Sequence, residues 1–300
     1  MSGAAYLPEQ GFPAWLQTFD ANNNEHEVAA SMFDRLFANL AQKPPPAWRE
    51  KETLRILEIA PGDGRFSRTI LDTIARHLGK KIEYVGVELN PQAAAEARRQ
   101  IQEGLIIESD MHREDLKTLL PHGFTPDLTL VSHAIYFTHD QRRFTGHIAA
   151  LGGDETLTLY LNNSAISSAL PDHLGDFNKA LARGPLKSYH SATETSHIRM
   201  PAADPFIYLE RFKSNPSPEG LDAPGIAMFN MLSFLQQKAL NEVTPQARLA
   251  LIDEVEQKLR RHDGVIPIEN QLTCTLSPRA DHALCSVAEQ AMKQLSRFKS

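Results

Sequence analysis

One short segment constrains the fold of this chain more than any other. The mainly apolar run Leu54–Ile59 ends in Pro61-Gly62-Asp63-Gly64, and apolar residues then recur at helical spacing over Phe66–Leu78. Glycines at this place let the backbone turn tightly and let a ligand approach the main chain. The segment therefore predicts a strand, a glycine-rich turn and a helix, which is the opening unit of an α/β sheet.

The same alternation continues along the chain. Further strands are predicted at 82–87, 105–107, 128–131, 156–161 and 266–276, and helices at 24–41, 91–101 and 141–151. Strands that alternate with helices at this pitch indicate a mostly parallel, Rossmann-like α/β sheet with helices on both faces. After residue 163 the pattern weakens; we expect a strand at 207–212 and helices at 226–240, 246–262 and 278–298.

Composition narrows the function classes. The 300 residues carry a net charge of -6, whereas a protein that grips nucleic-acid backbones usually has a basic surface, so no nucleic-acid partner is expected. The chain has no apolar run of about 18 residues and no signal-peptide pattern, which predicts a cytoplasmic protein without a membrane partner. The two cysteines and the scattered histidines lack ligand spacing, and we expect no metal site.

The glycine turn is neither the G-x-G-x-x-G fingerprint nor a P-loop, because Arg65 follows Gly64 and no Gly-Lys-Ser/Thr is present. It resembles the first motif of class I methyltransferases, acid-x-G/A-x-G-x-G. The resemblance implies S-adenosyl-L-methionine as the cofactor and S-adenosyl-L-homocysteine as the product. It places five residues beside the methionine part of the cofactor: Glu58, Ala60, Pro61, Gly62 and Gly64.

Three further segments follow the turn in the order that this family has. Glu88 ends the second strand, where an acid binds ribose hydroxyls. Asp110, followed by Met111, comes after the third strand, where the family contacts adenine. Ser132 and His133 end the fourth strand, at the edge where open α/β sheets bind ligands.

The residues after the fourth strand bear on the methyl acceptor. They lack the [D/N]-P-P-[Y/F] motif of nucleobase amine methyltransferases. Over roughly residues 19–276 the chain instead resembles the histamine N-methyltransferases, through segments 23–26 with 32–34, 133–140 and 234–272. That resemblance implies a small-molecule N-methyltransferase that acts on an amine or an imidazole-type nitrogen.

Carried over position by position, the resemblance makes Glu25 the amine-binding glutamate and Asn270 a substrate-binding asparagine. Tyr136 and Phe137 match two aromatics beside the substrate, and His133 stands where that family has a glutamine. We hypothesise that His133 takes the departing proton or accepts a substrate hydrogen bond, while Glu25 orients the substrate.

Simpler interpretations of these residues stay open. Glu25 could only stabilise its helix N-terminus, His133 could be structural, Tyr136 and Phe137 could pack the core, and Asn270 could bond loop backbone. Other acceptors are a natural-product hydroxyl or carboxyl, a protein side chain or RNA. A non-catalytic module that binds S-adenosylmethionine or a protein partner is the alternative of another class.

The predicted organisation has four parts. Residues 1–50 form an N-terminal helical cap and 51–163 the S-adenosylmethionine-binding core. Residues 164–262 form a substrate-binding or lid region, and 263–300 supply the final core strand and a C-terminal helix.

Overall fold

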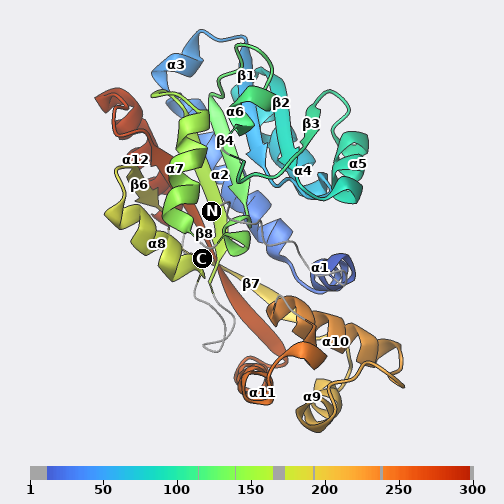
Figure 1. Ribbon diagram of the computed structural model, residues 1–300. Coiled ribbons are helices and arrows are strands. Elements are labelled where there is room, and N and C mark those ends of the chain that lie inside the picture. Colours follow the sequence, from blue (N-terminus) through green and yellow to red (C-terminus); the bar gives the residue numbers. More distant parts are fainter. Residues whose placement is uncertain are drawn as a thin grey trace.

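The computed structural model describes residues 12–113, 115–138, 140–164, 173–191, 193–236 and 239–297 (Figure 1). Its main sheet has the order β3-β2-β1-β4-β5-β8-β6, with β7 paired to β8. The first five of these strands are mutually parallel: β1 (Thr53–Ile59), β2 (Lys81–Glu88), β3 (Leu105–Glu108), β4 (Leu128–Ser132) and β5 (Leu157–Asn163). The predicted Rossmann-like, mostly parallel sheet is confirmed.

One long strand joins this sheet to the rest of the molecule. β8 (Val265–Leu276) runs antiparallel to β5 and, over residues 273–276, to β6 (Lys187–His190). Its first half, residues 265–270, pairs instead with β7 (Glu194–Arg199). β8 therefore extends past the carboxyl end of β5, and it carries residues of the main sheet and of a neighbouring lobe on one strand (Figure 1).

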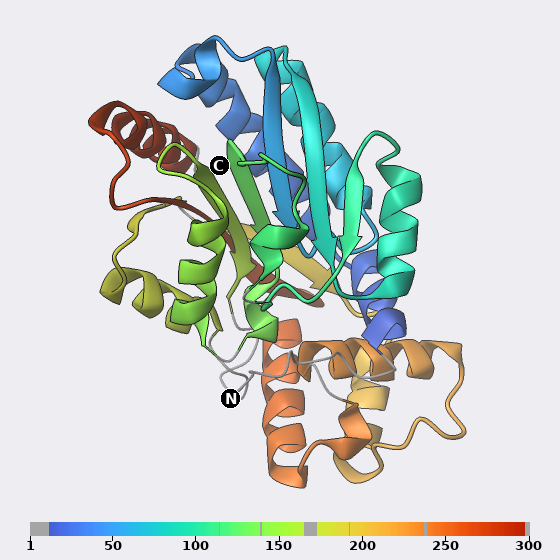
Figure 2. The same ribbon diagram turned by 45° about the horizontal axis from the view of Figure 1, so that its top comes forward.

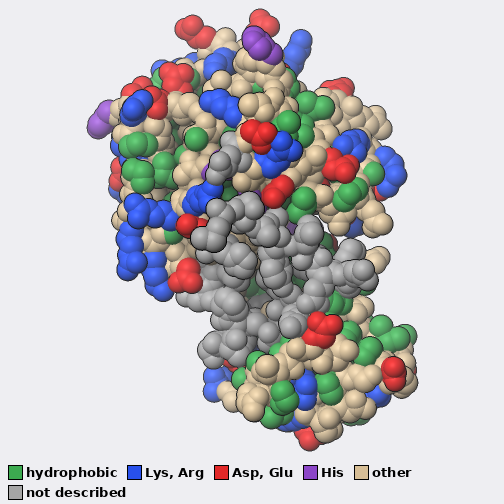
Figure 3. Space-filling view, viewed as in Figure 1, with side chains coloured by type: hydrophobic (Ala, Val, Ile, Leu, Met, Phe, Trp, Pro, Cys, Tyr) green, Lys and Arg blue, Asp and Glu red, His purple; other side chains and the backbone are tan. Residues whose placement is uncertain are grey.

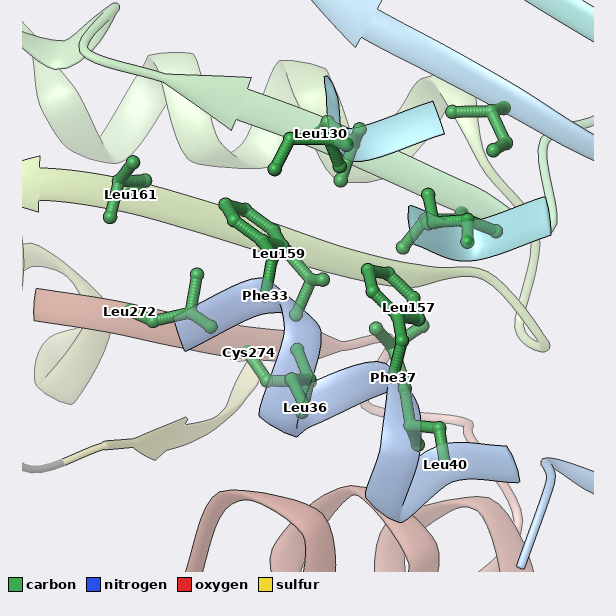
Figure 4. Packing of buried hydrophobic residues seen from close by; sticks show 14 of the residues in the cluster. Phe33, Leu36, Phe37, Leu40, Leu130, Leu157, Leu159, Leu161, Leu272 and Cys274 are labelled. Atoms are coloured by element: carbon green, nitrogen blue, oxygen red, sulfur yellow. The ribbon is translucent and has the colours of Figure 1, made fainter. Parts of the chain in front are cut away.

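One face of the sheet is covered by four helices: α2 (Glu25–Gln42), α4 (Arg65–Leu78), α5 (Pro91–Gln100) and α12 (His282–Arg297). The short α3 (Pro46–Arg49) contributes the fully buried Trp48 to the same core. Figure 4 shows Phe33 and Phe37 of α2 against Leu157 and Leu159 of β5. The apolar stripe of α2 follows helical spacing, so burying it against the sheet fixes the orientation of the whole helix.

The opposite face is covered by α6 (Leu116–Leu119), α7 (Gln141–Leu151), α8 (His173–Arg183) and the 3-10 turn η1 (Ile135–Phe137). Phe177 of α8 packs on Tyr160 of β5 with ring centroids 5.0 Å apart. The two faces together bury both sides of the parallel strands, which explains why these strands are almost continuously apolar.

A third apolar cluster lies beyond the carboxyl ends of the parallel strands (Figure 2). It is built by α9 (Pro205–Ser214), α10 (Ala223–Gln236), η2 (Leu240–Glu242) and α11 (Pro245–Arg261), which pack on β7 and on the first half of β8. Helix α1 (Phe12–Ala21) joins this helical lobe, where Phe19 stacks on Phe234 at 4.3 Å. Figure 3 shows the lobe as a separate protrusion from the main body.

The strand predicted at 207–212 is wrong, because this segment is the middle of helix α9. Asp204 caps the helix by accepting a hydrogen bond from the Phe206 N–H at 3.1 Å, and Pro205 occupies the first helical turn. A capped start with proline at that position favours a helix strongly enough to outweigh the strand preference of isoleucine and tyrosine.

The predicted division into four parts stays a prediction, but the structure adds detail to it. Helix α2 and strand β6 both belong to the main sheet assembly, whereas α9, α10 and α11 form their own cluster. Within the described residues no helix is both long and apolar enough to cross a membrane.

Candidate functional site

The glycine turn after β1 has a backbone that only glycine adopts comfortably. Gly62 and Gly64 have φ values of +60° and +80°. A Cβ atom on Gly64 would lie 2.9 Å from the Cα of Ala97 in helix α5, closer than real Cβ contacts. Ala60 also has a left-handed φ of 58°. The turn therefore brings the start of α4 close against α5 and holds an unusual backbone shape at the sheet edge.

Glu88, the predicted ribose-binding acid, lies directly against this turn. One carboxylate oxygen accepts the Gly62 N–H at 3.0 Å and the other accepts the Asn90 N–H at 2.9 Å. Burial raises the pKa of Glu88, although these backbone hydrogen bonds oppose the shift. Because each carboxylate oxygen can accept more than one hydrogen bond, Glu88 is held rigidly and can still accept two ligand hydroxyls.

The segment after β3 lies beside Glu88. The Ser109 N–H donates to the Glu88 carbonyl at 3.0 Å, and the hydroxyl of Ser109 is a buried group that has no hydrogen-bond partner among the described residues. Asp110 accepts the His112 N–H at 2.8 Å, and Met111 is buried next to it. A buried hydroxyl without a partner is costly, so a ligand that satisfies it would be stabilised here.

Glu58, predicted at the acidic position of the turn, is buried and accepts a hydrogen bond from the Tyr84 hydroxyl at 2.7 Å. Burial raises the pKa of Glu58 to about 7, against the opposing hydrogen bonds from Tyr84 and Ser67. The side chain thus ties β1 to β2 beneath the turn. Its predicted contact with the cofactor stays a prediction, as do those of Ala60 and Pro61.

The second group of predicted residues meets at the ends of β4 and β5. Glu25, the first residue of α2, has an Oε1 atom 2.7 Å from Nε2 of His133. The Glu25 side chain is 5% exposed and that of His133 is 27% exposed. His133 itself has a left-handed φ of 55°, which is uncommon for a residue with a side chain. The structure thus joins two residues that are far apart in the sequence.

Two effects compete in this ion pair. Burial alone would raise the pKa of Glu25, but the charge and hydrogen bond of His133 and a hydrogen bond from Asn163 outweigh it and lower that pKa. Burial alone would lower the pKa of His133, but the Glu25 carboxylate outweighs it and raises that pKa. Between pH 4.5 and 6.5, the ordinary pKa values of the two groups, both shifts favour a carboxylate paired with an imidazolium.

The position of Glu25 is fixed by the residues before it. The Asn23 side chain accepts the Glu25 N–H at 2.6 Å, and the Asn24 side chain accepts the His197 N–H of β7 at 2.7 Å. Asn24 precedes the helix but bonds a strand rather than capping its own helix. These contacts pin the start of α2 to β7 and so hold Glu25 over the sheet edge.

Tyr136 and Phe137 form the 3-10 turn after β4. The Tyr136 hydroxyl lies 3.5 Å from Nδ1 of His133 and accepts the Asn163 N–H. The Phe137 carbonyl lies 3.2 Å from a ring nitrogen of His112, which links this turn to the loop after β3. Ser132, half-buried, ends β4 immediately before His133. Tyr136 thus contacts the ion pair, whereas Phe137 connects the two halves of the edge.

Asn270 lies on β8 opposite Asn163 of β5. Its Nδ2 donates to the Glu194 carbonyl at 3.0 Å and to the Ile268 carbonyl at 3.5 Å, and the residue is fully buried.

Asn163 was not predicted as a site residue. It ends the fifth strand, and residues at the carboxyl ends of parallel strands often line a ligand site. Its position was therefore the signal that could have identified it.

Asp20 is a second residue that the sequence analysis missed. Burial raises its pKa to about 6, with His26 lowering it and Glu25 and Asp63 raising it. It lines a cavity of about 520 Å³ between α1, α2 and α4, and His26 stacks on Phe66 in the same place at 5.0 Å. Because the cavity adjoins Arg65, it lies beside the glycine turn.

Comparison with known families identifies the class. The model of a family described as "Putative S-adenosyl-L-methionine-dependent methyltransferase" matches residues 36–145. That range contains the glycine turn, Glu88 and His133. A search of curated proteins finds no match.

Solved structures with a similar arrangement include other methyltransferases. The plantazolicin methyltransferase BpumL in complex with SAH has 12% identity and a TM-score of 0.47, with 90% of this chain and 91% of that chain covered. A TehB-like SAM-dependent methyltransferase from Corynebacterium glutamicum has 15% identity and a TM-score of 0.38, with 60% and 88% covered. The YcgJ protein from Bacillus has 13% identity and a TM-score of 0.45, with 81% and 97% covered.

The family match and the edge geometry together define the class of this protein. It is an S-adenosylmethionine-dependent methyltransferase, and S-adenosylmethionine is its cofactor, as the sequence predicted. The residues present suit that cofactor: a rigid carboxylate for ribose at Glu88, a buried hydroxyl without a partner at Ser109, and a glycine turn that permits close approach. The narrower resemblance to histamine N-methyltransferases stays a prediction.

Proposed function

We propose that this enzyme methylates the nitrogen of a small-molecule amine or imidazole-type compound, held between the Glu25–His133 pair and the glycine turn. The observation that carries the proposal is the buried ion pair at the carboxyl end of β4, with Nε2 and Oε1 2.7 Å apart. A carboxylate and a titratable imidazole are suited to an acceptor that must bind as a base and lose a proton.

S-adenosylmethionine supplies an electrophilic methyl group on a sulfonium. The N–C bond forms as the C–S bond breaks, and the bond pair stays on sulfur. The acceptor nitrogen becomes positively charged in this step and then loses a proton. The chain must therefore hold the nitrogen lone pair in line and provide a proton acceptor.

We assign the proton acceptor role to Nδ1 of His133. Above its folded pKa the His133 ring is neutral, and because Glu25 engages Nε2, the remaining proton stays there and Nδ1 keeps a lone pair. Because the carboxylate raises the pKa of His133, this nitrogen is a stronger base than in a free histidine. The left-handed backbone of His133 and its contact with Tyr136 set the direction of the ring.

Glu25 then acts through His133 as well as on the substrate. Its carboxylate is already held by His133 and by a hydrogen bond from Asn163. The two residues work as one unit, and Tyr136 borders that unit. Phe137 and Asn270 are proposed to line the same acceptor site.

The test is methyl transfer to a panel of small amines and imidazoles, followed by mass spectrometry. We expect methylated product with wild type and a loss of about a hundredfold or more in kcat/KM with His133→Ala, the usual range for a proton-transfer group. His190→Ala on strand β6 is the matched control, since His190 bonds Thr273 away from this edge. Label transfer to RNA or protein with no small amine methylated would overturn the proposal.

A further inference from the structure

Two buried acceptor oxygens at the strand ends beside the Glu25–His133 pair have no partner. They are the Oδ1 atoms of Asn163 and Asn270, which have no hydrogen bond among the residues that the structure describes. Leaving a buried carbonyl-type oxygen unpaired is destabilising, because it loses its hydrogen bonds to water and gains none in the protein. Such a pair therefore indicates either an occupant that donates hydrogen bonds or an ordered water.

The orientation of both amides is set by their neighbours. Nδ2 of Asn270 donates to the carbonyls of Glu194 and Ile268, which can only accept. The Asn163 side chain bonds the Glu25 carboxylate, which also only accepts, so its Nδ2 is the end that faces Glu25. Rotating either amide would turn an oxygen toward another acceptor. The two free ends are thus oxygens.

The two side chains share one face of the sheet. Asn163 and Asn270 are register partners on the antiparallel strands β5 and β8, and such partners have Cβ atoms about 5 Å apart. Leu161 and Leu272, two residues away on the same strands, both pack in the cluster beneath α2. Alternation along a strand places the two asparagines on that same face, next to Glu25.

We infer that Asn163 and Asn270 form an acceptor subsite that selects methyl acceptors by their N–H donors, with Asn163 as a specificity-determining residue. The inference rests on the proposed function and narrows it to acceptors with a primary or secondary nitrogen. An acceptor nitrogen bound there would meet the Glu25 carboxylate and two amide oxygens, all of which accept hydrogen bonds. A fully substituted nitrogen or an acceptor carboxylate leaves the two oxygens unpaired or repels them.

The probes are phenethylammonium and its N,N-dimethyl and N,N,N-trimethyl forms, which keep one charge and one scaffold while N–H donors decrease. Binding to the SAH-loaded enzyme is measured by calorimetry. We expect wild type to prefer the primary over the trimethyl form by about tenfold or more, since one net hydrogen bond is worth about 1–1.5 kcal/mol. Asn163→Leu should reduce that preference to less than about threefold.

Asn178→Leu is the matched control, because Asn178 also has a buried oxygen without a partner but bonds Gln271 from helix α8. It should keep the full preference. Melting temperature and SAH affinity show whether each variant is folded. Asn163→Leu, Asn270→Leu and the double variant form a double-mutant cycle. The losses of preference in the two single variants should add up to more than the loss in the double variant, because both oxygens bind one nitrogen.

Three results would overturn the inference: equal loss for all three probes in Asn163→Leu, an unchanged preference in that variant, or an ordered water that keeps both oxygens satisfied in a crystal with the primary amine. Turnover separates this inference from the proposed function. If wild type methylates amines but Asn163→Leu keeps its preference for the primary probe, only the subsite is contradicted. If Asn163→Leu loses that preference but no amine is methylated, only the proposed function is contradicted. If no probe binds, both are contradicted.

Discussion

The two ends of the same sheet edge are built in different ways. The proposed cofactor end uses neighbours in sequence and main-chain groups: the Gly62 and Asn90 amides hold Glu88, all close to β1 and β2. The proposed acceptor end joins side chains from α2, β5, β8 and the residue after β4, with Glu25 and His133 paired over a long stretch of chain. A backbone-built site tolerates changes elsewhere, whereas a side-chain site depends on how distant elements pack.

The comparison is tested most strongly at Glu88. Glu88→Ala removes the carboxylate proposed to accept the ribose hydroxyls, and charged hydrogen bonds are worth about 1.5–3 kcal/mol each. We expect S-adenosylmethionine affinity to fall by about a hundredfold or more in calorimetry. Glu83→Ala, on the same strand but in an exposed pair with Arg55, should leave it unchanged. Unaltered binding by a folded Glu88→Ala would remove Glu88 from the cofactor site.

The acceptor end is probed by Glu25→Gln, which leaves His133 without its carboxylate. Removing one partner of a buried pair costs about 3–5 kcal/mol, and the 27% exposure of the His133 side chain reduces this to about 2–3 kcal/mol of unfolding free energy. Denaturant unfolding measures the loss, and Glu27→Gln, exposed on the same helix, is the control with less than about 0.5 kcal/mol. NMR should show a lower pKa for His133. A pKa that does not move contradicts the pairing.

A smaller effect is expected where the cofactor end depends on backbone shape. Gly64→Ala combines a φ of +80° with a Cβ 2.9 Å from Ala97, so we expect a loss of about 2 kcal/mol in unfolding free energy. Gly123→Ala has a φ of +75° but open space around the new atom, and should cost about 1 kcal/mol. Equal losses in thermal unfolding would show that close approach to α5 does not matter.

The smallest effect is a pH dependence. The pKa of Glu25 is lowered from 4.5, so its contribution is present above that value and is lost as pH falls through the folded pKa. The pKa of His133 is raised from 6.5, so its contribution is present below that value and is lost as pH rises through the folded pKa. The difference in unfolding free energy between wild type and Glu25→Gln should therefore peak between pH 4.5 and 6.5. A flat difference would show that the pair is not ionised.

Much of the fold could be predicted from the sequence because its strands and helices have clear periods. The strands at β1 to β5 and the helices α4, α5 and α7 follow patterns that one segment displays by itself. The 207–212 segment was predicted wrongly because the prediction followed its strand-favouring side chains. It gave too little weight to Asp204-Pro205, which is a typical start of a helix. Strand β7 was missed because its segment is short and mostly polar, so the sequence shows little sign of a strand. Its alternating burial arises only from pairing with β8.

The sequence by itself determined how the proposed cofactor end is built: a glycine turn and an acid at the next strand end are local in the chain, and local backbone geometry fixes their relation. Tertiary structure alone decided the acceptor end. Glu25 meets His133 only because α2 packs on β5 and is pinned to β7, and Asn163 faces Asn270 only because β8 enters the sheet antiparallel at one register. Contacts between distant elements depend on packing that no single segment encodes, which is why the sequence named Glu25, His133 and Asn270 but not their arrangement.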